Sequence, residues 1–281
     1  MKLFRNMAGL IFLLAVLCPS LMAQWPSYPS KRVPRTADGK PDLTAPTPRT
    51  ADGKPDLSGM WQNGGGGGQR GQRGAAPAAT PPPAPAGPPL AQFFNVGAGF
   101  KEGLPLQPWA ADLVKKRMAD NSKDNPDAHC LPMGFMQFHM HPQPRKIIQT
   151  PDEVVIIYEA NDGLRQIYTD GRPLPPKGVE PWWYGYSVGH WEGDTLVVQT
   201  RGFTDLQWLD VNGNPLTEEG TVTERFTRPN FGTLNIEVTI DDPKAYTKPF
   251  TVRLQQRAMV DTELIEFICE DRDASHYVGG K

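Results

Sequence analysis

Residues 184–203 constrain the fold more than any other part of the chain, because they have the pattern of a β-hairpin. Two extended runs flank Glu192-Gly193-Asp194, where glycine can adopt the positive φ that a tight reversal requires. The second run, residues 195–200, is rich in β-branched residues, which favour strands. We therefore expect a chain built mainly from antiparallel strands.

The first arm of this hairpin separates small side chains from large ones. Alternate positions hold small residues, namely Gly185, Ser187 and Gly189. The positions between them hold larger residues: Tyr184, Tyr186, Val188 and His190. Successive side chains of a strand point to opposite faces, so one face is nearly bare. Because small residues weaken a strand, we expect a ligand or another segment of backbone to approach that face closely.

Most of the remaining chain also has strand patterns, separated by turn residues. The predicted strands are residues 144–150, 153–160, 164–169, 184–191, 195–200, 222–228, 234–240, 250–257 and 263–270. A tenth strand could begin near Trp61. A sheet with this number of strands can close on itself, which leaves no exposed edge strand. The predicted fold class is mostly β, an antiparallel meander β-barrel of about 9–10 strands.

The segment before the barrel divides into parts of different composition. Residues 24–57 contain RTADGKPDL twice without change, at 35–43 and 49–57, and only the second copy runs directly into the candidate first strand at residues 58–62. Neither copy has an apolar face or the ligand spacing of a calcium loop, so we interpret each as a turn.

Two further segments complete the predicted organisation. Residues 63–90 are almost entirely Gly, Pro, Ala, Gln and Arg, which predicts a disordered insertion. Residues 91–281 are then expected to form the barrel domain, with one short helix at 108–118, where Pro108 suits the first turn.

The first 23 residues resemble a cleavable export signal. Lys2 and Arg5 precede an apolar run at 7–18 that is too short to span a bilayer, and small residues lead to Ala23. Cys18 as a lipidation site is the alternative, but Leu17 stands where a small residue is needed. A periplasmic or secreted protein without a membrane span is therefore predicted.

Export affects the net charge of the mature chain and the expected redox state of its cysteines. Removing residues 1–23 takes away two basic residues and leaves 27 basic against 31 acidic, a net charge of −4 that argues against a nucleic-acid partner. Cys130 and Cys269 remain and are predicted to form a disulfide in an oxidising compartment. Two separate buried thiols are the alternative.

Two resemblances support the barrel prediction. Gly59-Met60-Trp61 resembles the Gly-x-Trp opening of lipocalins and their calycin relatives, which implies a tryptophan that closes one barrel end beneath an arginine from a late strand. Arg253, Arg257 and Arg272 are the candidates for that arginine. RTADGKPDLSGMW at 49–61, WEGDTLVV at 191–198 and DDPKAYTKP at 241–249 also resemble a group of uncharacterised exported bacterial proteins, which implies a shared architecture but no reaction or ligand.

The leading hypothesis is a protein that binds an apolar or aromatic small molecule in the barrel cavity, without a cofactor. The predicted cavity wall is Tyr184, Tyr186, Ser187 and His190, with Glu224 as the polar anchor. Trp182 and Trp183 extend this aromatic group. Glu224 shares a strand face with apolar residues, where a carboxylate either pairs with an arginine of another strand or lines a pocket.

Three alternatives remain open. His139 and His141 would share one face of a strand and, with His129 or His190, could hold a metal in a hydrolase, lyase or isomerase that uses metal or acid/base chemistry. A serine hydrolase is the second, because residues 185–189 match Gly-x-Ser-x-Gly, but a second strand follows where a nucleophile elbow requires a helix. The third is a structural envelope protein without a ligand. The sequence does not determine the oligomeric state.

Overall fold

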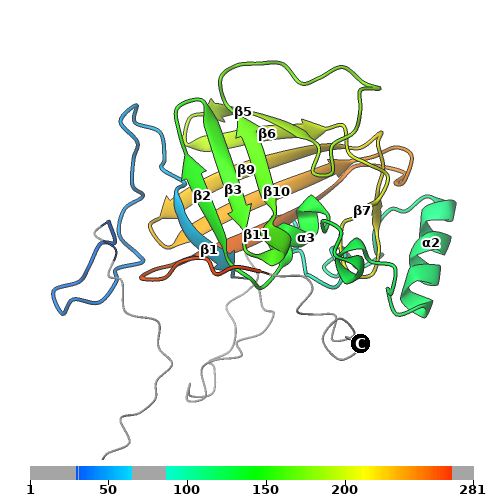
Figure 1. Ribbon diagram of the computed structural model, residues 1–281, viewed down its shortest axis with the longest axis horizontal. Coiled ribbons are helices and arrows are strands. Elements are labelled where there is room, and N and C mark those ends of the chain that lie inside the picture. Colours follow the sequence, from blue (N-terminus) through cyan, green and yellow to red (C-terminus); the bar gives the residue numbers. More distant parts are fainter. Residues whose placement is uncertain (1–29, 31, 65–86, 268–281) are drawn as a thin grey trace, which may run out of the picture.

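The computed structural model describes residues 30, 32–64 and 87–267. Nine strands form a closed barrel in the order β1-β11-β10-β9-β6-β5-β4-β3-β2 (Figure 1). The strands are β1 Gly59–Asn63, β2 Arg145–Gln149, β3 Glu153–Tyr158, β4 Leu164–Tyr168, β5 Tyr186–Glu192, β6 Thr195–Arg201, β9 Thr221–Asn230, β10 Thr233–Asp241 and β11 Phe250–Met259. The first strand closes the barrel by pairing with both β11 and β2.

Short elements lie outside this ring. They are helices α2 Pro108–Ala119 and α3 Phe135–Met140, 3-10 helices η1 Pro126–His129 and η2 Ala160–Asp162, and strands β7 Gln207–Trp208 and β8 Pro215–Leu216. The last two form a separate two-stranded sheet. Among the described helices, none combines the length and the apolar character that a membrane span requires.

The predicted barrel is confirmed, but its meander topology is only partly right. Strand β4 pairs with β5 in parallel, through Ile167 with Ser187 and Tyr168 with Val188. A parallel pair requires the chain to cross back to the starting end, and residues 169–185 make this crossover. The last predicted strand is not found in its described part, residues 263–267, and the rest of it lies outside the described residues.

The central hairpin forms as the sequence predicts. Strands β5 and β6 pair in antiparallel register from Tyr186 with Arg201 to Glu192 with Thr195. Gly193 in the turn has a φ of 59°. The strand pattern therefore identified the correct local partners, although it missed helix α3.

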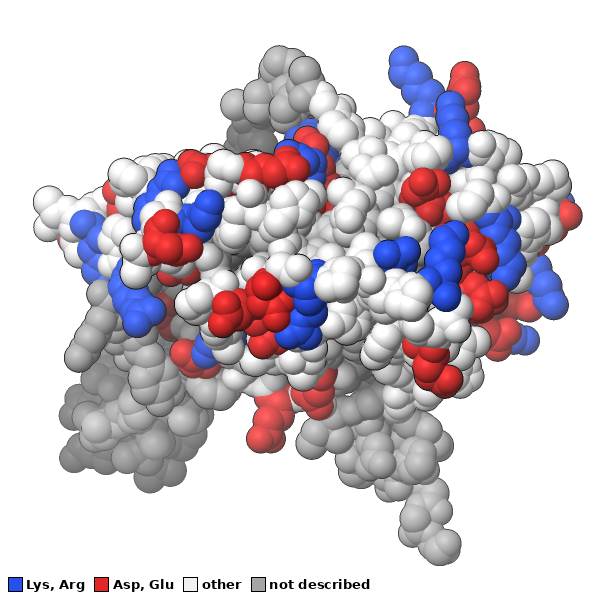
Figure 2. Space-filling view, turned by 90° about the horizontal axis from the view of Figure 1, so that it is seen from above, with Lys and Arg blue, Asp and Glu red and all other residues white. Residues whose placement is uncertain are grey.

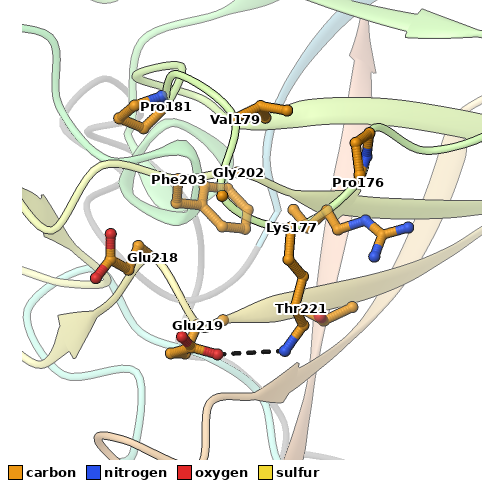
Figure 3. A pocket seen from close by; sticks show the side chains of 12 residues that line it. Pro176, Lys177, Val179, Pro181, Gly202, Phe203, Glu218, Glu219 and Thr221 are labelled. Atoms are coloured by element: carbon orange, nitrogen blue, oxygen red, sulfur yellow. Dashed lines mark hydrogen bonds and ion pairs between the residues drawn. The ribbon is translucent and has the colours of Figure 1, made fainter.

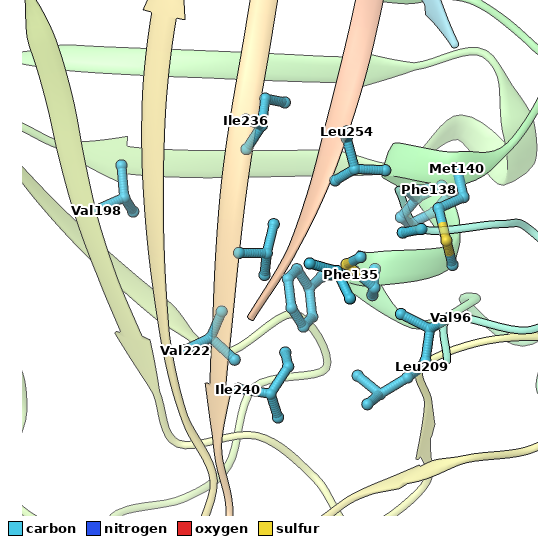
Figure 4. Packing of buried hydrophobic residues seen from close by; sticks show 14 of the residues in the cluster. Val96, Phe135, Phe138, Met140, Val198, Leu209, Val222, Ile236, Ile240 and Leu254 are labelled. Carbon is cyan, nitrogen blue, oxygen red and sulfur yellow. The ribbon is translucent and has the colours of Figure 1, made fainter. Parts of the chain in front are cut away.

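Side chains fill much of the barrel interior. Figure 4 shows Phe135 and Phe138 of α3 beside inward-facing residues of the strands, including Ile236 and Leu254. All four side chains are almost fully buried. Helix α3 also bonds to the two strands that flank β1, since Arg145 of β2 and Gln256 of β11 both donate to the His139 carbonyl. Ligand sites are therefore best sought at the barrel wall and its ends.

Trp61, on β1, is buried beneath an arginine. Its indole is fully buried, and its Nε1 donates to the Leu57 carbonyl at 3.0 Å. The guanidinium carbon of Arg228, on β9, lies 4.8 Å from the ring centroid. Arg253 instead donates to the Pro88 carbonyl, and Arg272 lies outside the described residues. An arginine therefore lies over the tryptophan as predicted, but it is Arg228, and neither Arg253 nor Arg257 occupies this position among the described residues.

Both copies of RTADGKPDL form the same turn. In the first copy the Thr36 amide donates to Lys40 and the Gly39 amide to Thr36. In the second copy Thr50 and Gly53 make the equivalent bonds. The interpretation of the repeat as a turn is confirmed for both copies.

Several predictions fall on residues outside the described part. They are the signal peptide at 1–23, residues 65–86 of the low-complexity insertion, and Cys269 of the predicted disulfide with Cys130. These stay predictions. The two ends of the insertion lie against β11: Gly64 donates to the Gln255 carbonyl and Ala91 to the Arg253 carbonyl.

Two of the glycines in residues 184–203 allow a test of the packing there. Gly185 has a φ of 68°, and an added Cβ would lie 2.6 Å from Thr200 Cγ2. Gly193 has a φ of 59°, with no neighbouring atom within 4 Å. Both alanine variants incur the cost of a left-handed backbone, so Gly193→Ala should lower the free energy of unfolding by about 1 kcal/mol. Gly185→Ala adds steric overlap and should cost about 3 kcal/mol. Urea denaturation measures both, and equal losses would contradict the close packing at Gly185.

Candidate functional site

A buried polar cluster lies inside the barrel around Glu224, on β9. The carboxylate is fully buried and accepts hydrogen bonds from His139 Nε2 at 2.9 Å and from Arg165 Nη1 at 3.0 Å. A second, short contact joins Arg165 Nη2 to the other carboxylate oxygen. The bidentate geometry is the strongest form of arginine–carboxylate pair. Of the two interpretations of Glu224, the ion pair with an arginine of another strand is the one observed.

Arg165 connects this carboxylate to the central hairpin. Its Nη2 donates to Ser187 Oγ at 3.1 Å and to Thr200 Oγ1 at 3.0 Å. The two hydroxyls are 2.9 Å apart, because Ser187 and Thr200 are direct partners across β5 and β6. The buried polar cluster, defined as His139, Arg165, Ser187, Thr200 and Glu224, therefore links α3 to four neighbouring strands.

The charges of this cluster are fixed at neutral pH. Burial alone raises the pKa of Glu224, but Arg165 and the His139 hydrogen bond outweigh it and lower that pKa to about 2. Burial lowers the pKa of His139 despite the attraction of Glu224, so the imidazole is neutral. Neutral His139 then donates from Nε2, and its Nδ1 is an acceptor without a partner among the described residues.

A second buried guanidinium lies beneath helix α3. Arg145 donates to the carbonyls of His139 at 2.7 Å and His141 at 3.0 Å, and burial lowers its pKa to about 10. Within the described part of the chain, Arg145 Nε has no hydrogen-bond partner. This region is therefore polar and charged, unlike the apolar cavity that the binding hypothesis predicts.

A pocket of about 190 Å³ opens in the barrel wall where β4 and β5 pair. These strands share only two register pairs, so few backbone hydrogen bonds join them there. Arg165 and Ser187 are almost fully buried and form the floor. The other lining residues are Leu164, Gln166, Tyr168, Trp182, Trp183, Tyr184, Gly185 and Tyr186. We call this the wall pocket.

Aromatic rings form the rim of the wall pocket. The ring centroids of Tyr168 and Tyr186 are 5.2 Å apart, and those of Trp182 and Tyr186 are 5.1 Å apart. The crossover at 169–185 positions Trp182 beside β5, since the Trp182 amide donates to the Gly202 carbonyl at 2.8 Å. The rim thus offers flat apolar surfaces above a polar floor.

The structure brings together four of the five predicted ligand-binding residues. Tyr184, Tyr186 and Ser187 line the wall pocket, and Glu224 lies behind its floor, bonded to Arg165. His190 does not join them, because its side chain is 62% exposed and pairs with Glu192. Tyr186 and His190 share the outer face of β5, and Ser187 points inward, so the predicted single wall combined both faces of one strand.

The histidines do not converge. His139 lies in helix α3 rather than in the predicted strand, and residues two apart on a helix point in nearly opposite directions. His141 packs edge-on against Phe93 at 4.9 Å, and His129 Nε2 contacts the Lys123 carbonyl at 2.9 Å. No group of three or more His, Cys, Asp or Glu side chains that could hold a metal ion occurs in the described ranges.

Ser187 does not have the surroundings of a catalytic nucleophile. Its Oγ bonds to Arg165 and Thr200 inside the barrel. The sequence offers Asp241 or Asp242, followed by His276, as the partners of a Ser-Asp-His triad. Asp242 bonds to the amide and hydroxyl of Thr217, and His276 lies outside the described residues. The strand after the turn also differs from the helix of a nucleophile elbow.

Sequence reasoning missed Arg165 and Thr200. Arg165 and Ile167 share the inward face of β4. In the same way, Glu224 shares the inward face of β9 with Val222 and Phe226. The alternation that places Glu224 on a core face therefore also places Arg165 on one. An arginine and a carboxylate that both occupy core positions of strands are expected to be partners.

A second pocket, of about 250 Å³, lies beside the crossover (Figure 3). Lys177 and Glu219 form an exposed ion pair across it at 3.2 Å. None of the predicted site residues lines it. On the face seen in Figure 2, acidic and basic side chains are interspersed, without a continuous patch of either sign.

Comparison of the chain with protein-family models, with curated proteins and with solved structures gave no match. The resemblances noted in the sequence therefore stay expectations. A fold alone does not define a function, so the function has to be argued from the geometry of the site.

Removing Arg165 tests the buried ion pair. Arg165→Leu leaves Glu224 buried without its cation and should lower the free energy of unfolding by about 3–5 kcal/mol. Arg172→Leu is the matched control, because its ion pair with Asp170 is exposed and should be worth less than about 1 kcal/mol. Urea denaturation of both variants gives the comparison. If Arg165→Leu costs no more than Arg172→Leu, the ion pair does not stabilise the barrel.

The lowered pKa values of His139 and Glu224 predict a loss of stability in acid. The unfolded chain takes up a proton on His139 near pH 6.5 and on Glu224 near pH 4.5, whereas the folded protein resists both. The free energy of unfolding should therefore fall as pH drops below about 6.5, with roughly 3 kcal/mol from Glu224 lost between pH 4.5 and about 2. His139→Gln should flatten the slope between pH 7 and about 5.5, and the exposed control His190→Gln should not. Identical slopes for the two variants would refute this assignment.

Proposed function

We propose that this is an exported protein that binds a small aromatic molecule in the wall pocket. The observation that supports the proposal is the aromatic rim above a polar floor, at the point where β4 and β5 separate. Export is supported by the pattern of residues 1–23. The barrel supplies a rigid frame for such a site.

The size and chemistry of the pocket favour a single-ring ligand. An apolar cavity of about 150 Å³ can hold benzene, and the wall pocket is slightly larger, at about 190 Å³. Tyr168, Trp182 and Tyr186 can contact a ring by stacking or edge-to-face packing. A polar substituent of the ligand would meet the hydroxyl of Ser187 or the guanidinium of Arg165.

The floor is organised before a ligand arrives. Five hydrogen bonds from Arg165 to Ser187, Thr200 and Glu224 hold its guanidinium in one orientation. A preorganised group loses little conformational entropy on binding. Because Glu224 balances the charge of Arg165, the pocket favours a neutral polar substituent such as a phenol hydroxyl.

The arrangement supports binding more strongly than catalysis. His139 is the buried residue suited to proton transfer, but it is only 1% exposed and does not line the wall pocket. Its bond to Glu224 places it on the inner side of the Arg165–Glu224 pair. A general base has to reach the proton that it removes, directly or through one water.

Titration with p-cresol tests the proposal. Trp182→Ala and Tyr186→Ala each remove one ring of the rim. Each should raise the Kd for p-cresol about three- to tenfold, as expected for the loss of one aromatic contact. Trp109→Ala is the matched control, because Trp109 is 43% exposed on α2 and Trp182 is 40% exposed. Isothermal titration calorimetry measures each Kd. Weakening by Trp109→Ala equal to that of the rim variants would contradict binding at this pocket.

Native mass spectrometry of the exported protein gives an independent result. We expect a bound small molecule in the wild-type spectrum and its loss in Trp182→Ala. A stoichiometric metal ion instead would support the alternative of a metal-assisted enzyme.

A further inference from the structure

Another pocket lies next to Trp61, along β1, β2 and the end of β11. This groove of about 600 Å³ has three walls. Val33 and Pro48 belong to the N-terminal segment, Met60 and Ile148 to β1 and β2, and Met259 and Val260 to the end of β11 and the chain after it. Figure 1 shows the N-terminal segment, in blue, beside β1 and β2. We call this the N-terminal groove.

The duplicated turn attaches the N-terminal segment beside the groove, through one arginine of each copy. In the first copy, Arg35 pairs with Asp261 at 2.7 Å, and Asp261 also accepts from the Ser30 amide at 2.8 Å. These bonds join residues 30–35 to the chain that follows β11. In the second copy the equivalent arginine, Arg49, pairs with Asp194 in the β5–β6 turn at 2.6 Å. The two copies therefore use the same arginine to attach the N-terminal segment at two separate places.

The groove has the size and surface of a small-molecule site. Its volume lies within the roughly 300–1,000 Å³ range of ligand pockets. Met60 and Met259 are direct partners across β1 and β11, and methionine side chains adapt to ligands of irregular shape. Ile148 is 41% exposed although it is a large apolar residue. An apolar ligand would cover this surface.

The charges around the groove are balanced. The cationic lining residues are Arg32, Lys146 and Arg228, and the anionic ones are Asp56, Asp261 and Glu263. Lys146 pairs with Glu263 at 2.8 Å, and Asp261 pairs with Arg35. A charged ligand would have to compete with these ion pairs, so the lining favours an uncharged one.

One buried donor at the groove has no acceptor. Arg228 is only 6% exposed, and its terminal nitrogens donate to the carbonyls of Ser58 at 3.3 Å and Phe231 at 2.6 Å, with a further short contact to Asp56. Its Nε has no hydrogen-bond partner among the described residues. Buried donors are nearly always satisfied, so an acceptor oxygen on a ligand would complete this site.

We propose that the N-terminal groove is a second binding site, for an uncharged, elongated apolar molecule with one oxygen acceptor, such as a long-chain alcohol. The apolar walls would contact the chain, and Arg228 would bind the oxygen. This inference does not depend on the function proposed for the wall pocket, because the two sites share no lining residue.

Fluorescence of the uncharged probe N-phenyl-1-naphthylamine tests the groove. Wild-type protein should increase the probe's emission, and 1-decanol should displace it. Ile148→Glu places a charge among the apolar walls and should raise the Kd of the probe at least tenfold. Leu206→Glu, at another exposed apolar position, is the matched control and should change the Kd less than twofold. Equal effects of the two variants, or no displacement by 1-decanol, would overturn the proposal.

Further measurements distinguish this site from the wall pocket. They also test whether the arginine of the first repeat copy supports the groove. Ile148→Glu should leave p-cresol binding unchanged. Loss of both ligands in a variant whose urea denaturation matches that of the wild type would overturn the assignment to separate sites. Arg35→Ala removes the ion pair that holds the N-terminal segment to Asp261. It should weaken probe binding about fivefold, more than Arg49→Ala. A larger effect of Arg49→Ala would overturn the role of the first copy.

Discussion

The Arg165–Glu224 ion pair is the interaction on which the interior of this barrel depends. It joins β4 to β9, which β5 and β6 separate in the barrel order. Both groups are almost fully buried, so each would be costly without the other. The hydroxyls of Ser187 and Thr200 accept further hydrogen bonds from Arg165, and the imidazole of His139 bonds to Glu224. Gly185, just before β5, lets Thr200 of this cluster approach closely, since an added Cβ there would lie 2.6 Å from Thr200 Cγ2.

The same arrangement explains why the candidate site lies in the wall of the barrel. Helix α3 and its aromatic residues fill much of the interior, while β4 and β5 meet through only two register pairs. The crossover needed for this parallel pair positions Trp182 beside Tyr186. Arg165 therefore has two roles: it balances a buried carboxylate, and it forms the floor of the wall pocket.

The duplicated turn attaches the N-terminal segment to the barrel at two places. Each copy forms the same local hydrogen bonds, which depend only on its own residues. Its arginine then pairs with whichever aspartate lies nearby, Asp261 for the first copy and Asp194 for the second. Such exposed pairs contribute little stability individually, so their main effect is to position the N-terminal segment along the groove.

Local sequence patterns determined the strands, the hairpin turn at Gly193 and the inward position of Glu224, because alternation and turn chemistry depend on neighbouring residues. They did not determine the parallel pairing of β4 with β5, the position of α3, or the partners of His139 and Trp61. Those features depend on which distant residues meet after the barrel closes: Arg165 could be identified as buried from its strand, but its pairing with Glu224 follows from a register across three strand interfaces. The tertiary structure alone decided that His190 faces solvent and that Arg228 lies over Trp61.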